Sequence, residues 1–292
     1  VAIGEEAKKM MGRVHKELNT IRPMRDGVIA DFEIAEGMLK EFIKKITSGF
    51  MPAKRIVICV PSGITEVEKR AVRDTAEKAG AKEVFLISEP MAAAIGIGLD
   101  VTAPFGNMII DIGGGTTEIA VIALSGITNG VSIRVAGDEL TEAIIRFFRA
   151  NQNMLIGETT AENIKCQVGS VMPLEEEIII EVKGRDLVAG VPKLTEVSSI
   201  EIREALNAPV QQMVEAVKKK KKKTAPELSS DILDRGIFLT GGGALLQGLD
   251  ERIRVETGVP VHVAEEPLTA VARGTGKVLE DINKYRKVLL SR

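Results

Sequence analysis

The sequence predicts an α/β fold with parallel strands, on three observations. Residues 55–96 read in the order strand, helix, strand, helix, the order that places helices over a parallel sheet. Two further apolar strands reach Asp111 and Thr240, and three consecutive glycines follow each, after Ile112 in the first case. With 292 residues, the chain is long enough for two domains or for one large two-lobed fold.

The first fifty residues contain clear helix signals. We expect a short helix over 5–12, then a loop, then a helix over 32–46. Asp31 is placed as the N-cap of this second helix, because a carboxylate there can accept from the first free amides. Apolar residues recur every three or four positions along the helix, which indicates one buried face. Gly49 is expected to end it.

The next segment supplies the parallel layer. Residues 55–61 are a continuous apolar run rich in β-branched side chains, which suits a strand buried on both faces. Thr65 with Glu68 three residues later is a capping box, so we expect a helix from there to Gly80. Residues 84–87 are a second buried strand, and an alanine-rich helix follows it.

The remainder of the chain alternates strand and helix signals around the two glycine runs. Tight glycine turns between apolar segments indicate strand ends at both places. The expected elements are, in order, strand 107–110, strand 119–123, strand 132–135, a helix through Phe148, helix 161–169, two alternating strands before 194, helix 199–217, strand 236–240, then a helix, a strand and a last helix from Pro267.

Composition narrows the class of protein. Hydrophobic residues make up 45% and charged residues 27% of the chain, as in ordinary globular proteins. The formal net charge of -2 argues against a non-specific nucleic-acid binder, which is normally basic. No run approaches the ~18 consecutive apolar residues of a membrane span. No signal peptide leads the chain, whose first residues resemble the end of a strand, so we expect it to begin inside a domain.

The cysteines and histidines give no sign of a metal site. Cys59 and Cys166 have no CxxC spacing, so both are interpreted as buried reduced thiols in a reducing compartment. His15 and His262 lie far apart and have no ligand-like neighbours, which argues against a zinc site.

The first glycine turn carries the strongest chemical signal. Asp111 ends an apolar strand, and Gly113, Gly114 and Gly115 follow. Glycine permits positive φ and a close approach of backbone amides to an oxyanion. Thr116 and Thr117 add hydroxyls that can bond phosphate oxygens or a water, and Asp111 is placed as a Mg²⁺ carboxylate acting through water. The alternative is a plain glycine-rich hairpin.

The second glycine turn repeats the pattern in a different setting. Gly241, Gly242 and Gly243 close an apolar strand and are expected to open a helix, whose N-terminus can bind an anion. A strand-to-helix turn can also be glycine-rich for packing alone. Neither turn matches a Walker A loop or a GxGxxG dinucleotide motif.

Two glycine-rich phosphate loops in two halves of a chain resemble the superfamily of actin, sugar kinases and heat-shock chaperone ATPases. Within this superfamily, the local sequence resembles the MreB family of bacterial cell-shape proteins along essentially the whole chain. The segments that carry the resemblance are IRPMRDGVIAD at 21–31, EPMAAAIG at 89–96, DIGGGTTE at 111–118, RGIFLTGGG at 235–243 and EPLTAVARG at 266–274.

The resemblance implies a two-lobed actin-like fold. Each lobe has a mixed β-sheet with flanking helices, and ATP with Mg²⁺ binds in the cleft. We expect lobe I over 1–104, lobe II over 105–255 with a smaller subdomain at about 140–205, and a strand and helix over 256–292 that return to lobe I.

The resemblance also implies residue roles. Glu89 corresponds to the acid that positions the attacking water, and Thr116 to a second water-orienting group. Asp111 corresponds to the magnesium-side aspartate. Further cofactor-binding residues are Gly137, Asp138 and Glu139 at ribose and phosphate, and Glu162 and Lys165 at adenosine. From the residues alone, Glu89 can instead interact with a helix dipole, and Glu162 with Lys165 can be a surface ion pair.

Family membership would further imply a weak ATPase whose head-to-tail filaments, paired antiparallel, organise wall synthesis and rod shape. The implied partners are the chain itself, the cytoplasmic face of the membrane and membrane proteins of wall synthesis, without nucleic acid. Phe50 and Met51, before Lys54, resemble the family's membrane-inserting loop. They can equally cap the underlying core.

The chain departs from the family pattern in three places. A first phosphate hairpin is expected before Val1, so one phosphate clamp and one magnesium-side aspartate are missing and sheet edges are exposed. Ser88 stands where relatives often carry an acid. Lys218–Lys223 is interpreted as a solvated helix end, with an acidic-lipid patch as the alternative, and Lys221 falls where the apolar stripe of the helix should continue.

Three other functions are compatible with parts of the pattern. A metabolite kinase of the same superfamily would need a separate Asp base, and we find no candidate. A peptide-binding chaperone would need a substrate domain after Arg292. The EPMAAA motif that begins at Glu89 argues against a division-type actin relative.

Overall fold

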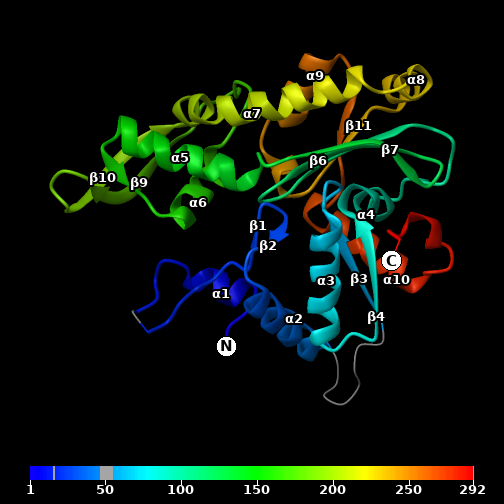
Figure 1. The fold of residues 1–292 in the computed structure, drawn as a ribbon. Coiled ribbons are helices and arrows are strands. Elements are labelled where there is room, and N and C mark those ends of the chain that lie inside the picture. The colour runs from blue at the N-terminus through cyan, green and yellow to red at the C-terminus, as the bar shows by residue number, and fades with distance from the viewer. Residues whose placement is uncertain (16, 47–54, 292) are drawn as a thin grey trace. The chain divides into compact units, whose positions relative to one another are not determined.

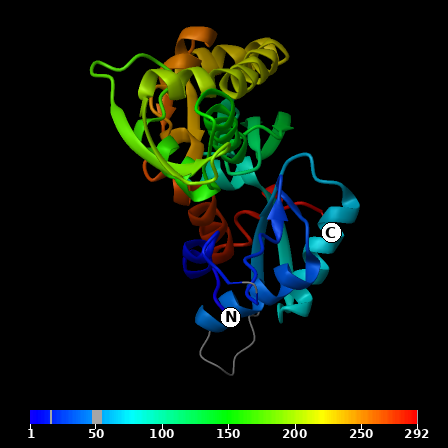
Figure 2. The same ribbon diagram turned by 90° about the vertical axis from the view of Figure 1, so that its left-hand side faces the viewer.

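The computed structural model describes residues 1–15, 17–46 and 55–291, and the chain divides into two compact units. Unit 1 comprises Val1–Asp100 and Val271–Arg292, and unit 2 comprises Val101–Ala270 (Figures 1 and 2). The sequence predicts that residues 256–292 return to lobe I. In the structure, residues 256–270 group with unit 2 instead. The reason is β12 (Val261–Val263), which pairs in parallel with β11 (Ile237–Thr240).

Unit 1 is built around one parallel strand pair. Its first helix is followed by a small hairpin and by α2, whose N-cap is Asp31, because the Asp31 carboxylate accepts from the Ile34 amide at 3.0 Å. Thr65 and Glu68 form the predicted capping box at the start of α3. The elements are α1 (Glu5–Met10), β1 (Met24–Arg25), β2 (Val28–Ile29), α2 (Phe32–Ile46), β3 (Arg55–Val60), α3 (Glu66–Lys78), β4 (Glu83–Ser88), α4 (Glu89–Gly96), α10 (Ala270–Glu280) and η3 (Arg286–Val288).

The end of the chain completes unit 1 by packing on α4. A Cβ at Gly274 in α10 would lie 1.8 Å from the carbonyl oxygen of Ala92, so only glycine allows this approach. Lys277 then donates to the carbonyls of Ile95 and Gly96, at 3.1 Å each. The ammonium satisfies carbonyls that the end of α4 leaves open.

β3 is less buried than its sequence predicts. It pairs with β4 from Arg55–Glu83 to Val60–Ser88, but Val60 alone is buried and Arg55 is exposed. The expectation of a strand buried on both faces is wrong here, because in the described residues this sheet has only two strands.

Unit 2 contains two sheets. The larger has the order β12-β11-β5-β6-β7, with β5 parallel to β11 and antiparallel to β6. The smaller is the antiparallel sheet β10-β9-β8. Remaining bounds are β5 (Asn107–Ile112), β6 (Thr117–Ala123), β7 (Gly126–Ile133), α5 (Gly137–Asn151), β8 (Met154–Leu155), α6 (Glu158–Val168), β9 (Ile179–Asp186), β10 (Pro192–Ser198), α7 (Ser199–Lys222), α8 (Pro226–Arg235), η1 (Gly242–Leu245), α9 (Leu249–Thr257) and η2 (Pro267–Thr269).

The core of unit 2 lies on the central strands. Every residue of β5 and β6 is buried, as expected for apolar runs covered on both faces. The long helix α7 packs against β6, β7, α5 and α9 (Figure 1). Its apolar stripe of Val210, Met213, Val214 and Val217 is buried in the same cluster as the strands.

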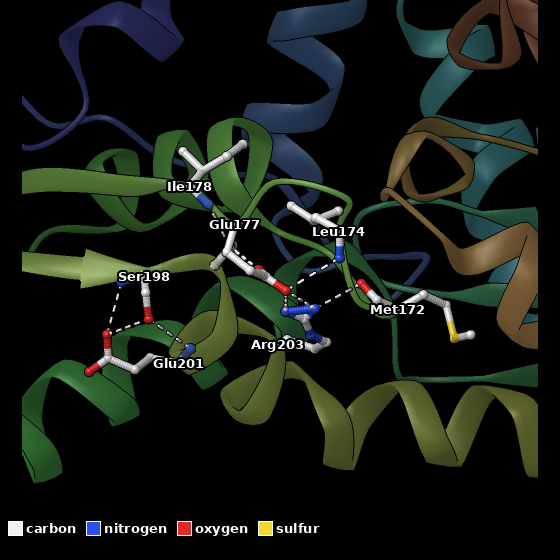
Figure 3. A network of polar contacts seen from close by, with 8 residues as sticks. Met172, Leu174, Glu177, Ile178, Ser198, Glu201 and Arg203 are labelled. Carbon is white, nitrogen blue, oxygen red and sulfur yellow. Dashed lines mark hydrogen bonds and ion pairs between the residues drawn. The ribbon is translucent and has the colours of Figure 1, made fainter.

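Polar contacts fix the start of α7 (Figure 3). Glu177 accepts from the Ser199 hydroxyl and from the Arg203 guanidinium, at 2.9 and 2.5 Å for the latter. Arg203 also donates to the Met172 carbonyl at 3.0 Å. These bonds fasten the segment before β9 to the first turns of α7. They hold the pKa of Glu177 below its usual range, with the Ser199 bond as the largest cause.

Several sequence expectations need correction. Both thiols are less buried than expected, since Cys166 is exposed and Cys59 is half-buried. Helix α8 has no counterpart in the sequence prediction, and α7 continues through the lysine run. Phe50 and Met51 lie outside the described residues. No described helix has the length and hydropathy needed to cross a membrane.

Candidate nucleotide site

The first glycine turn joins β5 to β6 in unit 2. The Gly113 amide donates to the Thr116 carbonyl at 2.9 Å and closes the turn. None of Gly113, Gly114 and Gly115 has positive φ, contrary to the sequence argument. Gly114 is exposed at the tip of the turn, and Gly113 and Gly115 are partly exposed. Because these residues have no side chain, their backbone amides are not covered by one. In the described part of the chain, the Gly114 and Gly115 amides donate to no protein acceptor.

The start of α5 lies against this turn. Gly137 donates to the Gly113 carbonyl at 3.1 Å, and Asp138 donates to the Gly114 carbonyl at 2.7 Å. A Cβ at Gly137 would lie 3.2 Å from that Gly113 oxygen, a tight contact. These two backbone bonds hold the turn in place, and they leave open the predicted contact of Gly137 and Asp138 with ribose and phosphate.

The two threonines after the turn have different surroundings. Thr117 is fully buried, and its hydroxyl donates to the Val135 carbonyl at 2.7 Å. Its hydroxyl hydrogen is thus used inside the protein. Thr116 is 7% exposed, and no protein partner for its hydroxyl occurs among the described residues. Thr116 is therefore the threonine whose hydroxyl remains open to a ligand or a water.

Asp111 lies beside the turn in the interior of unit 2. Its carboxylate accepts a hydrogen bond from the Thr240 hydroxyl at 2.8 Å. Glu118 lies opposite Asp111 in the register of β5 and β6. Burial raises the pKa of Asp111 to about 6; the Thr240 bond lowers it, and the Glu118 charge raises it. A buried carboxylate with a neighbouring acid favours a nearby cation. The described residues include no group of three His, Cys, Asp or Glu side chains that could hold a metal ion.

The second glycine turn, predicted to bind the cofactor, is closely packed against β5. Gly241 has φ +79°, and its Cβ would lie 2.3 Å from the Ile112 carbonyl oxygen. A Cβ at Gly243 would lie 2.2 Å from Ile112 Cγ2, and one at Gly242 would lie 3.0 Å from Leu268. The turn opens the four-residue 3-10 helix η1 and not the expected α-helix. The helix-dipole argument for an anion therefore does not apply, since η1 has a single turn.

Glu162 and Lys165 form more than a surface ion pair. Lys165, whose side chain is 13% exposed, donates to Glu162 at 2.6 Å and to the Gly137 carbonyl at 2.9 Å. It also contacts the Thr141 hydroxyl at 3.0 Å. The pair thus fastens α6 to the first turn of α5, directly behind the glycine turn. Glu139 pairs with Arg146 at 2.6 Å on the outside of α5.

Glu89 belongs to unit 1. It is the first residue of α4 and directly follows the carboxyl end of β4. The residue is half-buried, and the Ser88 side chain makes no capping hydrogen bond. The strand-to-helix turn at Glu89 thus matches the sequence prediction.

Sequence reasoning missed three residues that build the site. Thr240 orients the Asp111 carboxylate, Thr141 joins Lys165 to α5, and the Val135 carbonyl holds Thr117. Thr240 could have been found, because it is the last residue of β11 and lies opposite Asp111 on the neighbouring parallel strand β5. The other two are tertiary contacts with no sequence signal.

Comparison with known proteins identifies the family. The family described as MreB/Mbl protein matches residues 1–287. The chain is 53% identical to the cell shape-determining protein MreB of Escherichia coli K12, covering 99% of this chain and 84% of the relative. It is 48% identical to the cell shape-determining protein Mbl of Bacillus subtilis 168, covering 100% and 88%.

Solved structures agree on the fold. MreB5 of Spiroplasma citri bound to ADP superposes with a TM-score of 0.92 at 35% identity, over 98% of this chain and 87% of that one. A MamK double helical filament superposes with a TM-score of 0.79 at 22% identity, over 96% and 85%, and supports the fold alone. The predicted family and the actin-like α/β fold are both confirmed: this chain belongs to the MreB/Mbl family of actin-like cell-shape proteins.

Proposed function

We propose that this protein binds ATP with Mg²⁺, hydrolyses it slowly, and assembles into filaments that organise wall synthesis at the cytoplasmic face of the membrane. The observation that carries the proposal is the open glycine turn beside Asp111. The Gly114 and Gly115 amides have no protein acceptor among the described residues. Related MreB5 structures hold ADP and AMPPNP, which supports a nucleotide as the ligand.

In the proposed complex, the Gly114 and Gly115 amides donate to phosphate oxygens, as backbone nests do elsewhere. The α5 start and Lys165 keep the turn in that geometry before the ligand arrives. Asp111 holds the hydrated Mg²⁺, which supplies positive charge to the phosphoryl oxygens. Thr240 keeps the carboxylate oriented for this contact.

For hydrolysis, we propose that Glu89 and Thr116 orient a water toward the terminal phosphorus. The water oxygen forms a bond to the terminal phosphorus while the bond between that phosphorus and the bridging oxygen breaks, which gives ADP and phosphate. The released proton passes to the Glu89 carboxylate or to the phosphate. Positioning is the main contribution of protein groups in such reactions, so a slow rate is expected.

Assembly is the proposed output of this chemistry. Head-to-tail contacts that do not close into a ring generate filaments, and MamK, of the same fold, forms a double helical filament. We further propose that unit 1 corresponds to lobe I and unit 2 to lobe II, with residues 140–205 as the smaller part of lobe II. Membrane lipids and wall-synthesis proteins are the proposed partners.

The test is a sedimentation assay of the full-length protein with ATP and Mg²⁺, with phosphate release measured in parallel. We expect polymer to pellet in both the wild type and a Glu89→Ala variant, and phosphate release to fall in the variant. Truncating an acid or base of this kind typically costs about 10²- to 10⁴-fold in rate. Two results would contradict the proposal: protein that stays soluble at all concentrations, and ATP turnover only when a small acceptor is added. Either result would favour the alternative function of a metabolite kinase.

A further inference from the structure

The end of α7 and strand β7 enclose a strongly basic cavity in unit 2. Its volume is about 720 Å³, and its walls include Asn129 on β7 and five of the lysines in Lys218–Lys223. β7 is also the last strand of its sheet in the described structure. The family site on the glycine turn does not involve these residues.

Three of the lysines are held by protein groups. Lys218 pairs with Glu215 at 3.0 Å and with Glu256 at 3.2 Å. Lys221 donates to the Thr257 carbonyl at 2.5 Å. Lys220 is buried, with 6% of its surface exposed, and donates to Asn129 at 2.5 Å across the cavity wall. This arrangement corrects the sequence expectation, because Lys220 and not Lys221 continues the buried stripe of α7.

The other three lysines add positive charge, which Glu215, the carboxylate in the described lining, offsets only in part through its interaction with Lys222. Lys219, Lys222 and Lys223 are exposed and line the cavity. Among the described residues, they have no acidic side chain within ion-pair distance. Burial, followed by the charge of Lys223, lowers the pKa of Lys220. The dipole of α7 offsets only about half an elementary charge at its C-terminus, so a bound anion would relieve this repulsion.

The lining indicates which anion. The volume falls in the range of small-ligand sites, roughly 300–1,000 Å³. Lysine ammonium groups bind phosphate as point charges, whereas arginine binds both carboxylates and phosphates through its planar fork. The described lining contains neither arginine nor an aromatic ring on which a base could stack. Lys219 to Lys223 span about 6 Å of helix axis, which suits a compact anion better than an extended acidic peptide.

We propose that this cavity is a binding site for a compact oligophosphate, recognised through its phosphate groups by Lys219, Lys222 and Lys223, with Lys220 and Asn129 as its floor. The phosphates can belong to a soluble oligophosphate or to an anionic lipid headgroup. The site is independent of the nucleotide site proposed above. Its occupation would remove the repulsion at the end of α7 and stabilise unit 2.

The test is calorimetric titration of the full-length protein with sodium tripolyphosphate. A Lys219→Gln/Lys222→Gln/Lys223→Gln variant is compared with a control, Lys82→Gln/Lys183→Gln/Lys287→Gln, which removes the same charge from exposed lysines elsewhere. We expect the first variant to bind at least about tenfold more weakly through loss of charge-assisted contacts, and the control to stay within about twofold of wild type. Both variants retain the glycine turn, so binding there cancels in the comparison.

A second arm identifies the source of the phosphate. Flotation with phosphatidylcholine vesicles, with and without phosphatidylglycerol, is run on the same two variants. Binding lost only in the α7 variant supports the site, with tripolyphosphate or with vesicles as the ligand. Equal weakening in both triple variants would overturn the proposal as non-specific electrostatics. A glutamate peptide of matched charge that binds more tightly than tripolyphosphate would also overturn it, in favour of a protein partner at the β7 edge.

Discussion

At the scale of single residues, two similar glycine runs have different surroundings. Gly114 is exposed, and a Cβ there would meet only Asp138 at an ordinary 3.5 Å. Gly243 lies against β5, and its Cβ would lie 2.2 Å from Ile112 Cγ2. The sequence motif is nearly the same at both places. The difference arises from what the fold brings to each turn, and it can be tested by matched substitutions.

We expect Gly243→Ala to lower the free energy of unfolding by about 1–3 kcal/mol, the usual cost of overpacking. Gly114→Ala should change it by less than about 1 kcal/mol but should weaken ATP binding, since the new methyl group stands where phosphate must approach. Urea unfolding and an ATP titration of both variants check this. Equal stability of the two variants would contradict the packing role of the second turn.

Asp111 predicts a specific pH dependence. Its pKa is about 6 in the folded protein and 3.8 as the ordinary value, so the folded state favours the protonated form. Without Mg²⁺ and nucleotide, the contribution of Asp111 to stability is fully present below pH 4, falls as pH rises through 6, and is lower by about 3 kcal/mol above it. Asp111→Asn should remove this fall. Urea unfolding at pH 5 and pH 8 with a chelator measures it, and an unchanged pH difference in the variant would contradict the assignment.

At the scale of elements, Lys165 connects α6 to α5. It donates to Glu162, to the Gly137 carbonyl and to the Thr141 hydroxyl, with 13% of its side chain exposed. We expect Lys165→Met to lower the unfolding free energy by about 2 kcal/mol, because charged hydrogen bonds are lost and Glu162 loses its cation. A double-mutant cycle with Glu162→Gln checks it, and a coupling energy near zero would contradict the clamp.

Most elements could be predicted from the sequence because their signals are local. The capping box at Thr65 and the N-cap at Asp31 appear as predicted. Exposure of β3 could not be predicted, since it depends on which strands lie beside it. The 3-10 turn after Gly241 could not be predicted either, because the close approach to Ile112 is a tertiary contact.

The candidate site was predicted only in part. The positions of Asp111 and of the first glycine turn follow from a strand signal that ends in glycine. The interior roles of Thr117, Gly137 and Lys165 do not, because their partners are carbonyls supplied by other elements. The lysine run shows the same limit: its charges are visible in the sequence, whereas the burial of Lys220 depends on β7.

At the scale of the whole molecule, the chain belongs to a family of actin-like proteins. The family and fold are shown by likeness along the entire chain. We propose that ATP bound at the β5–β6 turn and Mg²⁺ bound at Asp111 together determine which conformation polymerises. Ligand binding can shift such a state only through a difference in affinity between conformations.

The most direct test is therefore the affinity of the full-length protein for ATP, titrated with and without Mg²⁺, in the wild type and in Asp111→Asn. We expect Mg²⁺ to tighten ATP binding in the wild type by about tenfold or more, a difference of about 1.4 kcal/mol. In Asp111→Asn the two titrations should coincide. A full Mg²⁺ effect in the variant would contradict the central claim, because the metal would then be held without the carboxylate on which the account depends.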